Sequence, residues 1–216
     1  MIKIEKAEVY GWEASIRGMR NPLNSWDKSD SIFGNDSVFV IGDCDLSLMR
    51  KLAKAGSDHR KFLRQIMVSV DITAPLYWWK EFDTYKVGTV ANSCSTMHTI
   101  HKKPFELDDF SHEHLFNACD MRTVDYCDYL LTLEIVIDTL NDARNKFLDT
   151  KDKSYWWQII QLLPASFNQK RTITLNYEVL LNMYHARKNH KLDEWHTLCD
   201  WIRTLPYSEL ITGEGE

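Results

Sequence analysis

The chain has 216 residues, of which 44% are hydrophobic and 26% are charged, close to the averages of globular proteins. This composition argues against collagen, a coiled coil or intrinsic disorder, and the length is sufficient to bury a sizeable core. Lysine and arginine number 26 against 31 aspartates and glutamates, so the formal net charge is −5. An acidic chain is poorly suited to a polyanion, so we expect no nucleic-acid polymer as partner.

The five cysteines form no CxxC pair and are odd in number, which fits a reducing compartment better than a disulfide framework. No apolar run approaches the roughly 18 residues that span a membrane, and the first ten residues lack an apolar signal core. We therefore expect a cytoplasmic protein without a membrane partner. His112 and His114 lack a third ligand at suitable spacing, so we predict no metal site.

The first half of the chain predicts two strands and a helix. Apolar and polar residues alternate over residues 2–10, which predicts a strand. Residues 17–37 are polar and rich in turn formers, which predicts a loop. Apolar spacing predicts a helix over residues 45–56, with Gly56 as its C-cap. A β-branched alternation near residues 62–73 predicts a second strand, stopped by Pro75.

The second half is predicted to be mainly helical. A short helix is expected over residues 76–87, followed by a small, polar loop at 88–98. Apolar residues at helical spacing predict long helices over 112–148, a helix at 154–163, and helices over much of 170–205. No internal repeat or linker is visible, so one α+β domain is the simplest architecture.

The stretch Asn92-Ser93-Cys94-Ser95-Thr96 is the first candidate for chemistry. Its hydroxyl and amide side chains and its backbone N–H groups suit an oxyanion, although an ordinary polar turn has the same composition. Cys94 is either a nucleophile or a small buried filler.

Two clusters of basic residues stand out against the acidic total. Each is either a solvated helix face or a site for a small phosphate-bearing ligand, because arginine makes bidentate contacts to phosphate. The clusters consist of Arg50, Lys51, Lys54, His59, Arg60, Lys61 and Arg64, and of Lys170, Arg171, Arg187, Lys188, His190 and Lys191.

The segment LLPASFNQKRTITLNYEVLLNMYHARKNHKLDEW, residues 162–195, carries a specific pattern. It resembles the flavin-dependent thymidylate synthases, which show Leu-Pro, an Asn twelve residues after the Pro, then Leu, Asn, Leu-Arg, His and Glu. The matching residues are Pro164, Asn176, Leu180, Asn182 and Arg187, with His190 and Glu194 following after a one-residue deletion.

A second segment, ITAPLYWWKEFDTYKVGTVANSCST at residues 72–96, resembles that family in layout. The family has Ala-Pro, an aromatic-rich helix, an Arg-His-Arg-x-x-Ser signature and a Ser-Gly-Arg loop. In this chain most of the arginines are replaced, and an Arg-to-Lys change is not neutral at a bidentate site. The departures are Thr84, Tyr85 and Lys86 for Arg-His-Arg, Thr89 and Cys94 for the two Ser, Thr96 for the loop Arg, Glu81 for a Gln, and Glu178 for an Arg.

The resemblance implies a single flavin-dependent thymidylate synthase-like α+β domain over residues 1–216, with a mixed sheet and long helices. It also implies a homotetramer with active sites between subunits. The ligands implied are FAD, a pyrimidine deoxynucleotide monophosphate such as deoxyuridylate, methylene-tetrahydrofolate and NADPH. In that chemistry a methyl group reaches C5 of uracil without a cysteine nucleophile, and the protein positions the reactants around the flavin.

The resemblance also implies residue roles. Arg187 would hold the pyrimidine of the nucleotide, and Asn176 and Asn182 would contact the flavin. Lys86 would contact flavin or phosphate, and the loop 92–96 would cradle the phosphate. The remaining matched positions are His190, on the cofactor side, and Glu81, in the substrate pocket.

Three functions remain open from the sequence. The first is a divergent flavin-dependent thymidylate synthase. The second keeps the fold and alters the C5 chemistry, for example to hydroxymethylation, with Cys94 as nucleophile beside Glu81. The third is a non-catalytic nucleotide- or protein-binding module, which the lost arginines favour and the retained Asn176, Asn182 and Arg187 oppose.

Overall fold

The computed structural model describes residues 2–34, 39–117 and 128–214. The chain divides into two compact units, each assembled from separate segments. The prediction of a single domain stays a prediction. Unit 1 comprises Thr73–Phe82 and Ser93–Arg171, and unit 2 comprises Ile2–Ile72, Asp83–Asn92 and Thr172–Glu216.

Both units combine helices with strands, which confirms the predicted α+β class. The strands of the main sheet are β1 Lys3–Tyr10, β4 Met67–Pro75, β5 Val90–Ser93 and β6 Asn168–Asn176. Unit 2 also has α1 Trp12–Arg20, β2 Ile32–Phe33, β3 Phe39–Val40, α2 Asp43–Lys54, α7 Tyr177–Arg187, α8 Asp193–Arg203 and α9 Glu209–Thr212. Unit 1 has α3 Leu76–Phe82, α4 Thr96–Thr99, α5 Tyr129–Thr150 and α6 Lys153–Leu162. Short 3-10 helices are η1 Asn21–Leu23, η2 Trp26–Lys28, η3 Arg60–Gln65 and η4 Leu107–Asp109.

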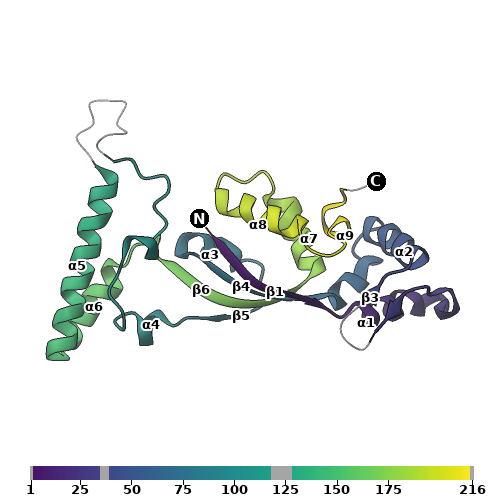
Figure 1. Ribbon diagram of the computed structural model, residues 1–216, viewed down its shortest axis with the longest axis horizontal. Helices are drawn as coiled ribbons and strands as arrows, with labels where there is room; N and C mark the ends of the chain where they lie inside the picture. The colour runs from purple at the N-terminus through teal and green to yellow at the C-terminus, as the bar shows by residue number, and fades with distance from the viewer. Residues whose placement is uncertain (1, 35–38, 118–127, 215–216) are drawn as a thin grey trace. The chain divides into compact units, whose positions relative to one another are not determined.

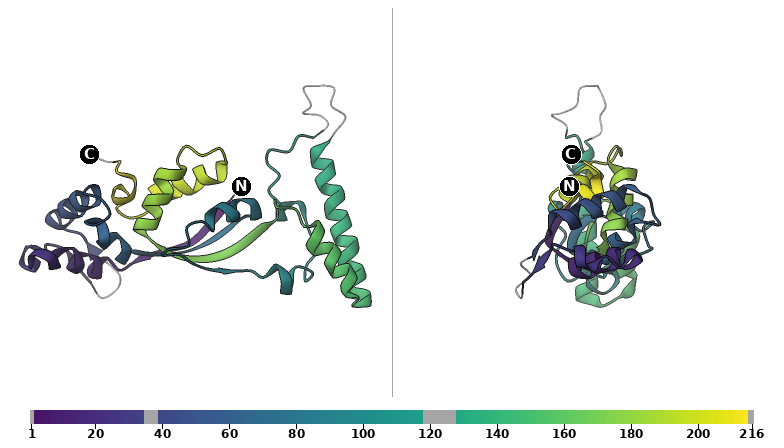
Figure 2. Two further views of the ribbon diagram at one scale, coloured as in Figure 1. Left: turned by 180° about the vertical axis from the view of Figure 1, so that it is seen from behind. Right: turned by 90° about the vertical axis from the view of Figure 1, so that its right-hand side faces the viewer.

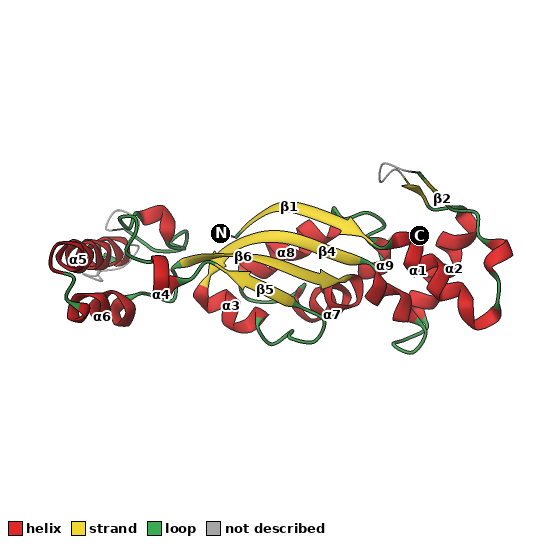
Figure 3. Cartoon of the chain, turned by 90° about the horizontal axis from the view of Figure 1, so that it is seen from below, coloured by secondary structure: helices red, strands yellow, loops and turns green. Residues whose placement is uncertain are grey.

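The four strands of the main sheet are ordered β1-β4-β6-β5 (Figure 3). Alternate side chains of β4 are buried, namely Val68, Val70 and Ile72. In β6 the same alternation buries Ile173 and Leu175. Successive strand residues point to opposite faces, so one face of this part of the sheet is apolar. In unit 2, α7 and α8 lie over this face (Figures 1 and 3).

The opposite face of the unit 2 sheet carries polar bonds between neighbouring strands. The Ser69 hydroxyl lies 3.2 Å from that of Thr174 and 3.3 Å from that of Tyr10. Thr172 donates to Asp71 at 2.7 Å. Such cross-strand pairs stabilise a sheet and specify its register, because a one-residue slip would turn each polar side chain into the core.

The core of unit 2 contains an aromatic cluster around Trp12. Its ring lies 5.4 Å from the ring of Phe39 and 5.3 Å from those of Tyr177 and Tyr207. The Tyr177 hydroxyl donates to the carbonyl of Pro206 at 2.6 Å, which satisfies a buried polar group. Burial raises the pKa of the Tyr177 phenol, so this hydroxyl stays a donor.

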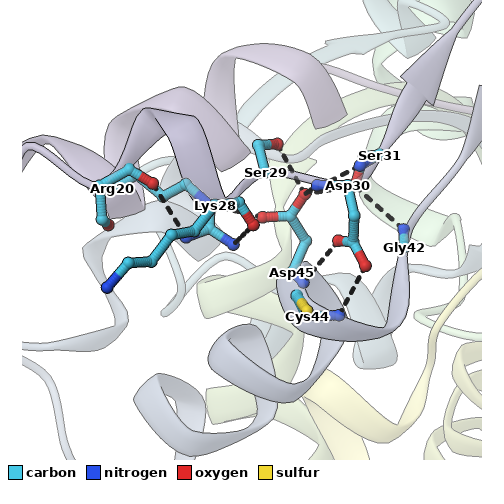
Figure 4. A network of polar contacts seen from close by, with 9 residues as sticks. Arg20, Lys28, Ser29, Asp30, Ser31, Gly42, Cys44 and Asp45 are labelled. Atoms are coloured by element: carbon cyan, nitrogen blue, oxygen red, sulfur yellow. Dashed lines mark hydrogen bonds and ion pairs between the residues drawn. The ribbon is translucent and has the colours of Figure 1, made fainter.

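A buried ion pair fastens α1 and the segment after it to α2 (Figure 4). Arg20 Nε donates to Asp45 at 2.6 Å, with only 4% and 0% of the two side chains exposed. The other Asp45 oxygen accepts the hydroxyls of Ser29 and Ser31. Burial opposes ionisation, but hydrogen bonds from the two serines and the guanidinium outweigh it and lower the pKa of Asp45. Stability from this carboxylate is therefore present at neutral pH and is lost as the pH falls through the lowered pKa.

In unit 1, α5 and α6 pack side by side (Figures 1 and 2). α5 buries Leu133, Ile137 and Leu140, which lie four and three residues apart on one helical face. Ile159 of α6 and Phe110 join the same core. Side-chain caps begin both helices: Asp128 accepts the N–H of Leu131, and Asp152 accepts the N–H of Ser154.

Several predicted elements are confirmed with shifted ends. The strand predicted at 2–10 is β1, and the helices predicted at 45–56 and 154–163 are α2 and α6. The C-cap of α2 is Ala55, and Gly56 follows it with a φ of +97°, the left-handed conformation that suits glycine. The strand predicted near 62–73 begins later, at Met67, because a 3-10 helix occupies the preceding residues.

Other predictions are wrong. The loop predicted from residue 17 overlaps α1, whose N-cap Gly11 has no side chain to cap the helix. The loop predicted at 88–98 contains β5 and α4, and β5 escapes detection because all four of its residues are exposed. The helix predicted at 76–87 ends at Phe82.

The two long helical regions also need correction. Of the predicted helices at 112–148, residues 112–117 are not helical and α5 begins at Tyr129, while 118–127 lie outside the described residues. The start of the region 170–205 is β6 rather than helix, because Ile173 and Leu175 alternate with polar residues. Among the helices that the structure describes, none is long and apolar enough to cross a membrane.

We expect Asp45→Ala to lower the free energy of unfolding by about 3–5 kcal/mol, because it leaves the buried Arg20 guanidinium without its counter-charge. Asp43→Ala, at an exposed first-turn position of the same helix, should cost less than about 1 kcal/mol. Urea denaturation of both variants measures the difference. Equal losses would show that the buried pair contributes no more than a surface carboxylate.

Candidate functional site

In unit 2 a cavity of about 480 Å³ lies beside the junction of β6 and α7. Its lining combines amide, guanidinium and carboxylate side chains with apolar surface, which suits a ligand that has both polar and apolar parts. The lining residues are Ser57, Arg60, Arg64, Val87, Gly88, Asn176, Glu178, Val179 and Asn182.

Asn176 lies where β6 ends and α7 begins. It is the last residue of β6 and the N-cap of α7, and its Oδ1 accepts the N–H of Val179 at 3.1 Å. The cap satisfies one of the open N–H groups of the helix and sets the direction of its first turn. Glu178 and Asn182 are four residues apart on α7 and therefore share one face of the helix, on the cavity.

Gly88 approaches this junction more closely than another residue could. It has a φ of +78°, and an added Cβ would lie 3.1 Å from Asn176 Nδ2 and 3.2 Å from Val179 Cγ2. A side chain here would be strained by the left-handed φ and would push on the cavity wall. The absent side chain therefore keeps space open beside the amide nitrogen of Asn176.

Two arginines of η3 converge on one carboxylate in the cavity. Glu178 accepts from Arg60 Nε at 3.3 Å, and from Arg64 through Nε and through Nη2, the latter at 3.3 Å. The hydrogen bond from Arg64 is the main reason that the pKa of Glu178 is lowered. The carboxylate stays ionised at neutral pH and orients both guanidinium groups.

Arg187, at the end of α7, is held by two aromatic rings. Its guanidinium carbon lies 4.8 Å from the Trp195 ring centre and 5.7 Å from that of Tyr85, and its Nε donates to the Tyr85 hydroxyl at 3.1 Å. Cation–π contacts of this kind fix a flexible side chain in one orientation. Trp195 is fully buried, so it provides a rigid support.

The other two expected cofactor residues of unit 2 are not among those lining this cavity. Lys86 is exposed, and its carbonyl accepts the N–H of Thr89 at 3.4 Å in the turn that contains Gly88. His190 lies in the turn after α7, with its ring 6.2 Å from that of Trp195, and its Nδ1 accepts the N–H of Leu192.

The segment 92–96 is more ordered than a polar loop. The Cys94 N–H donates to the Lys170 carbonyl at 2.9 Å, and the Cys94 carbonyl accepts from Gln169 at 2.8 Å. The Ser95 hydroxyl caps α4 by accepting the N–H of His98. The N–H of Cys94 and the Ser95 oxygen are thus already engaged, so fewer groups remain for an anion than the sequence suggested.

A cavity of about 290 Å³ in unit 1 adjoins this segment. Cys94, Ser95 and Thr96 line it, and Cys94 is exposed rather than a buried filler. Asn92 and Ser93 are exposed in β5, and Glu81 is partly buried in α3. Lysines on the walls give the cavity a basic character: Lys102, Lys103 and Lys170, of which Lys103 pairs with Asp109 at 2.5 Å.

Only some of the expected site residues line a cavity, and Arg187, Lys86, His190, Asn92, Ser93 and Glu81 are not among the lining residues of either one. Asn176 and Asn182 meet at the unit 2 cavity, and Cys94, Ser95 and Thr96 meet at the unit 1 cavity. Within the described stretches there is no group of three or more His, Cys, Asp or Glu side chains arranged to hold a metal ion.

Sequence comparison gives no relatives for this chain: no family model matches it, and no curated protein does. Solved structures do match. Thymidylate synthase X (ThyX) from Helicobacter pylori, crystallised with FAD and dUMP, aligns over 99% of this chain and 98% of its own, with a TM-score of 0.68 at 14% identity. The UMP/dUMP methylase PolB from Streptomyces cacaoi, bound to 5-Br dUMP, aligns over 100% and 95%, with a TM-score of 0.63 at 13% identity.

The chain has the fold of the flavin-dependent thymidylate synthases. The resemblance seen in the sequence is thereby confirmed for the fold. The unit 2 cavity offers amide donors, two guanidinium groups and the space beside Gly88, which suit the polar and anionic parts of a ligand. Asn176 and Asn182, singled out from the sequence, belong to that lining.

The sequence alone did not assign several residues of the unit 2 site, among them Arg60, Arg64, Gly88 and Tyr85. Arg60 and Arg64 were seen only as members of a basic cluster, because their shared contact with Glu178 depends on how η3 packs against α7. Gly88 had no signal, because its close approach to Asn176 depends on tertiary packing. Tyr85 was noted as a departure from the family signature, but its bond to Arg187 is visible only in the structure.

Proposed function

We propose that the chain transfers a one-carbon group to C5 of a pyrimidine deoxynucleotide monophosphate, in a reaction of the dUMP-to-dTMP type that uses FAD. The observation that carries this proposal is the ThyX-like fold over nearly the whole chain, combined with Asn176 and Asn182 on the lining of one cavity. Neighbours crystallised with dUMP or its 5-bromo analogue support a pyrimidine nucleotide as substrate.

In this proposal the unit 2 residues bind and orient the flavin and the pyrimidine. The amides of Asn176 and Asn182 hold the flavin by hydrogen bonds, and the Gly88 turn allows the ligand to approach the backbone. Arg187 donates to the pyrimidine carbonyl oxygens and is kept in place by Trp195 and Tyr85. We also propose that Lys86 and His190 contact the cofactor.

The segment 92–96 and Glu81 serve the nucleotide in this proposal. Asn92, Ser93 and Thr96 provide side-chain donors to the phosphate, and Glu81 accepts a hydrogen bond from the base. The lysines near Cys94 favour a negatively charged group. When bound, reduced flavin supplies the redox chemistry of the methyl transfer, with methylene-tetrahydrofolate as the one-carbon donor and NADPH as the reductant. A homotetramer with shared sites belongs to the same proposal.

A second function is favoured by one observation, the exposure of Cys94 at a basic cavity. In that case the thiolate adds to the pyrimidine ring, and the fold performs another C5 transfer such as hydroxymethylation. A non-catalytic nucleotide- or protein-binding module is the outcome if neither chemistry occurs.

The cofactor is tested by reconstitution. Purified protein incubated with FAD and passed through a desalting column should retain the visible absorbance of flavin, because the unit 2 cavity offers amide and guanidinium donors. A colourless protein after this treatment would contradict a flavoprotein.

We expect Arg187→Ala to weaken deoxyuridylate binding about ten- to a hundredfold, because a charge-assisted hydrogen bond in a partly dry pocket contributes roughly 1.5–3 kcal/mol. Isothermal titration calorimetry measures the affinity. Arg17→Ala, at an exposed position on α1, is the matched control and should bind as the wild type does. Unchanged affinity in Arg187→Ala, or no binding by the wild type, would remove the assignment.

Cys94→Ser separates the two chemistries. If the thiol is not a nucleophile, the serine variant should keep turnover of deoxyuridylate with reduced flavin and methylene-folate. Serine is far weaker as a nucleophile near neutral pH, so loss of turnover with an intact circular dichroism spectrum would favour the altered chemistry. No turnover in either protein would favour the binding module. We expect turnover to be retained.

A further inference from the structure

The lining of the unit 2 cavity carries more positive charge than a site for an uncharged flavin ring would need. Two of its lining residues, Arg60 and Arg64, are cations, and one, Glu178, is an anion. The lining therefore carries a net charge of about +1 in addition to the positive end of α7, which begins at the same junction. A neutral ring system would not need this charge.

The arrangement of the arginines leaves donors for a ligand. Glu178 engages Arg60 through Nε, so this pair does not use its two terminal nitrogens. It engages Arg64 through Nε and Nη2, so Nη1 of Arg64 is not used by the pair. A carboxylate that binds the inner edge of a guanidinium fixes its plane, and the outer nitrogens then form a fork for phosphate oxygens.

Exposure of the three side chains fits this division of roles. The Glu178 side chain is 11% exposed and that of Arg60 is 21% exposed, while that of Arg64 is 52% exposed. The Glu178 carboxylate is thus the least exposed of the three side chains, and Arg64 is the most exposed. The ion pair between Arg64 and Glu178 adds little to the stability of the fold, because ion pairs with a half-exposed partner contribute little to the free energy of folding.

We propose that Arg60 and Arg64 bind the diphosphate of the flavin dinucleotide, with Glu178 as the positioning residue that orients them. The inference rests on the proposed function and assigns the cofactor's phosphates to residues of this chain. It also accounts for the replacement of arginine by Glu178 on α7. The two arginines lie on η3, and Glu178, which holds them, stands on α7 at the position where the resemblance places an arginine.

The test measures the affinity for FAD, by flavin fluorescence, in Arg60→Gln, Arg64→Gln and the control Arg17→Gln. We expect each cavity variant to bind FAD about ten- to a hundredfold more weakly and to show a smaller loss of affinity with added salt than the wild type. The control should match the wild type. Thermal denaturation of each variant confirms that the protein is folded.

Riboflavin, which has no phosphate, is the second probe. Its affinity should be the same in the wild type and in both cavity variants. A variant that loses riboflavin and FAD equally has a damaged ring site, which would overturn the assignment to phosphates. FAD affinity that is unchanged in both variants would overturn this inference alone, whereas a wild type that binds no flavin would overturn the proposed function as well.

Discussion

Asn176 joins the sheet to α7, the helix that carries most of the unit 2 site. Its geometry sets the direction of that helix and therefore the positions of the site residues on it. The residue keeps an extended backbone, while its side chain caps α7 through the N–H of Val179. The next N–H, that of Tyr177, donates to the Ile66 carbonyl at 3.0 Å, which ties the start of the helix to the end of η3. A cap of this kind contributes about 1 kcal/mol, but its larger effect is to set the helix direction. Glu178, Asn182 and Arg187 take their positions from it.

Charge is distributed differently in this chain than the family signature implies. In the resemblance drawn from the sequence, Tyr85 stands at the position of the signature His, and in the structure its hydroxyl accepts a hydrogen bond from Arg187. The guanidinium groups at the cavity come instead from η3 and are anchored by Glu178. Both arrangements hold an arginine by contacts to the inner edge or the flat face of its guanidinium group, which lowers the entropy that ligand binding would otherwise cost.

Fold and sequence have diverged to different extents. An identity of 13–14% accompanies a TM-score of 0.63–0.68 over nearly the full chain, because buried positions require size and polarity rather than particular residues. Val68, Val70 and Ile72 in β4, or Leu133 and Leu140 in α5, are replaceable by other apolar side chains. A retained fold does not specify a reaction, and the assignment of function therefore depends on the residues at the two cavities.

The sequence by itself determined the elements whose signal is local. The alternation of β1, the helical spacing of α6 and the α+β class required only neighbouring residues, and the motif of Asn176, Asn182 and Arg187 lies almost entirely on one helix. Tertiary structure alone decided the rest. β5 has no buried face to produce a pattern, and it forms because its backbone pairs in the sheet. Arg60 and Gly88 lie far from Asn176 in the chain, and Trp195 reaches Arg187 only because a turn brings α8 back beside α7. Their contacts arise only when β6, η3 and α8 pack together, since long-range packing leaves no periodic trace in the sequence.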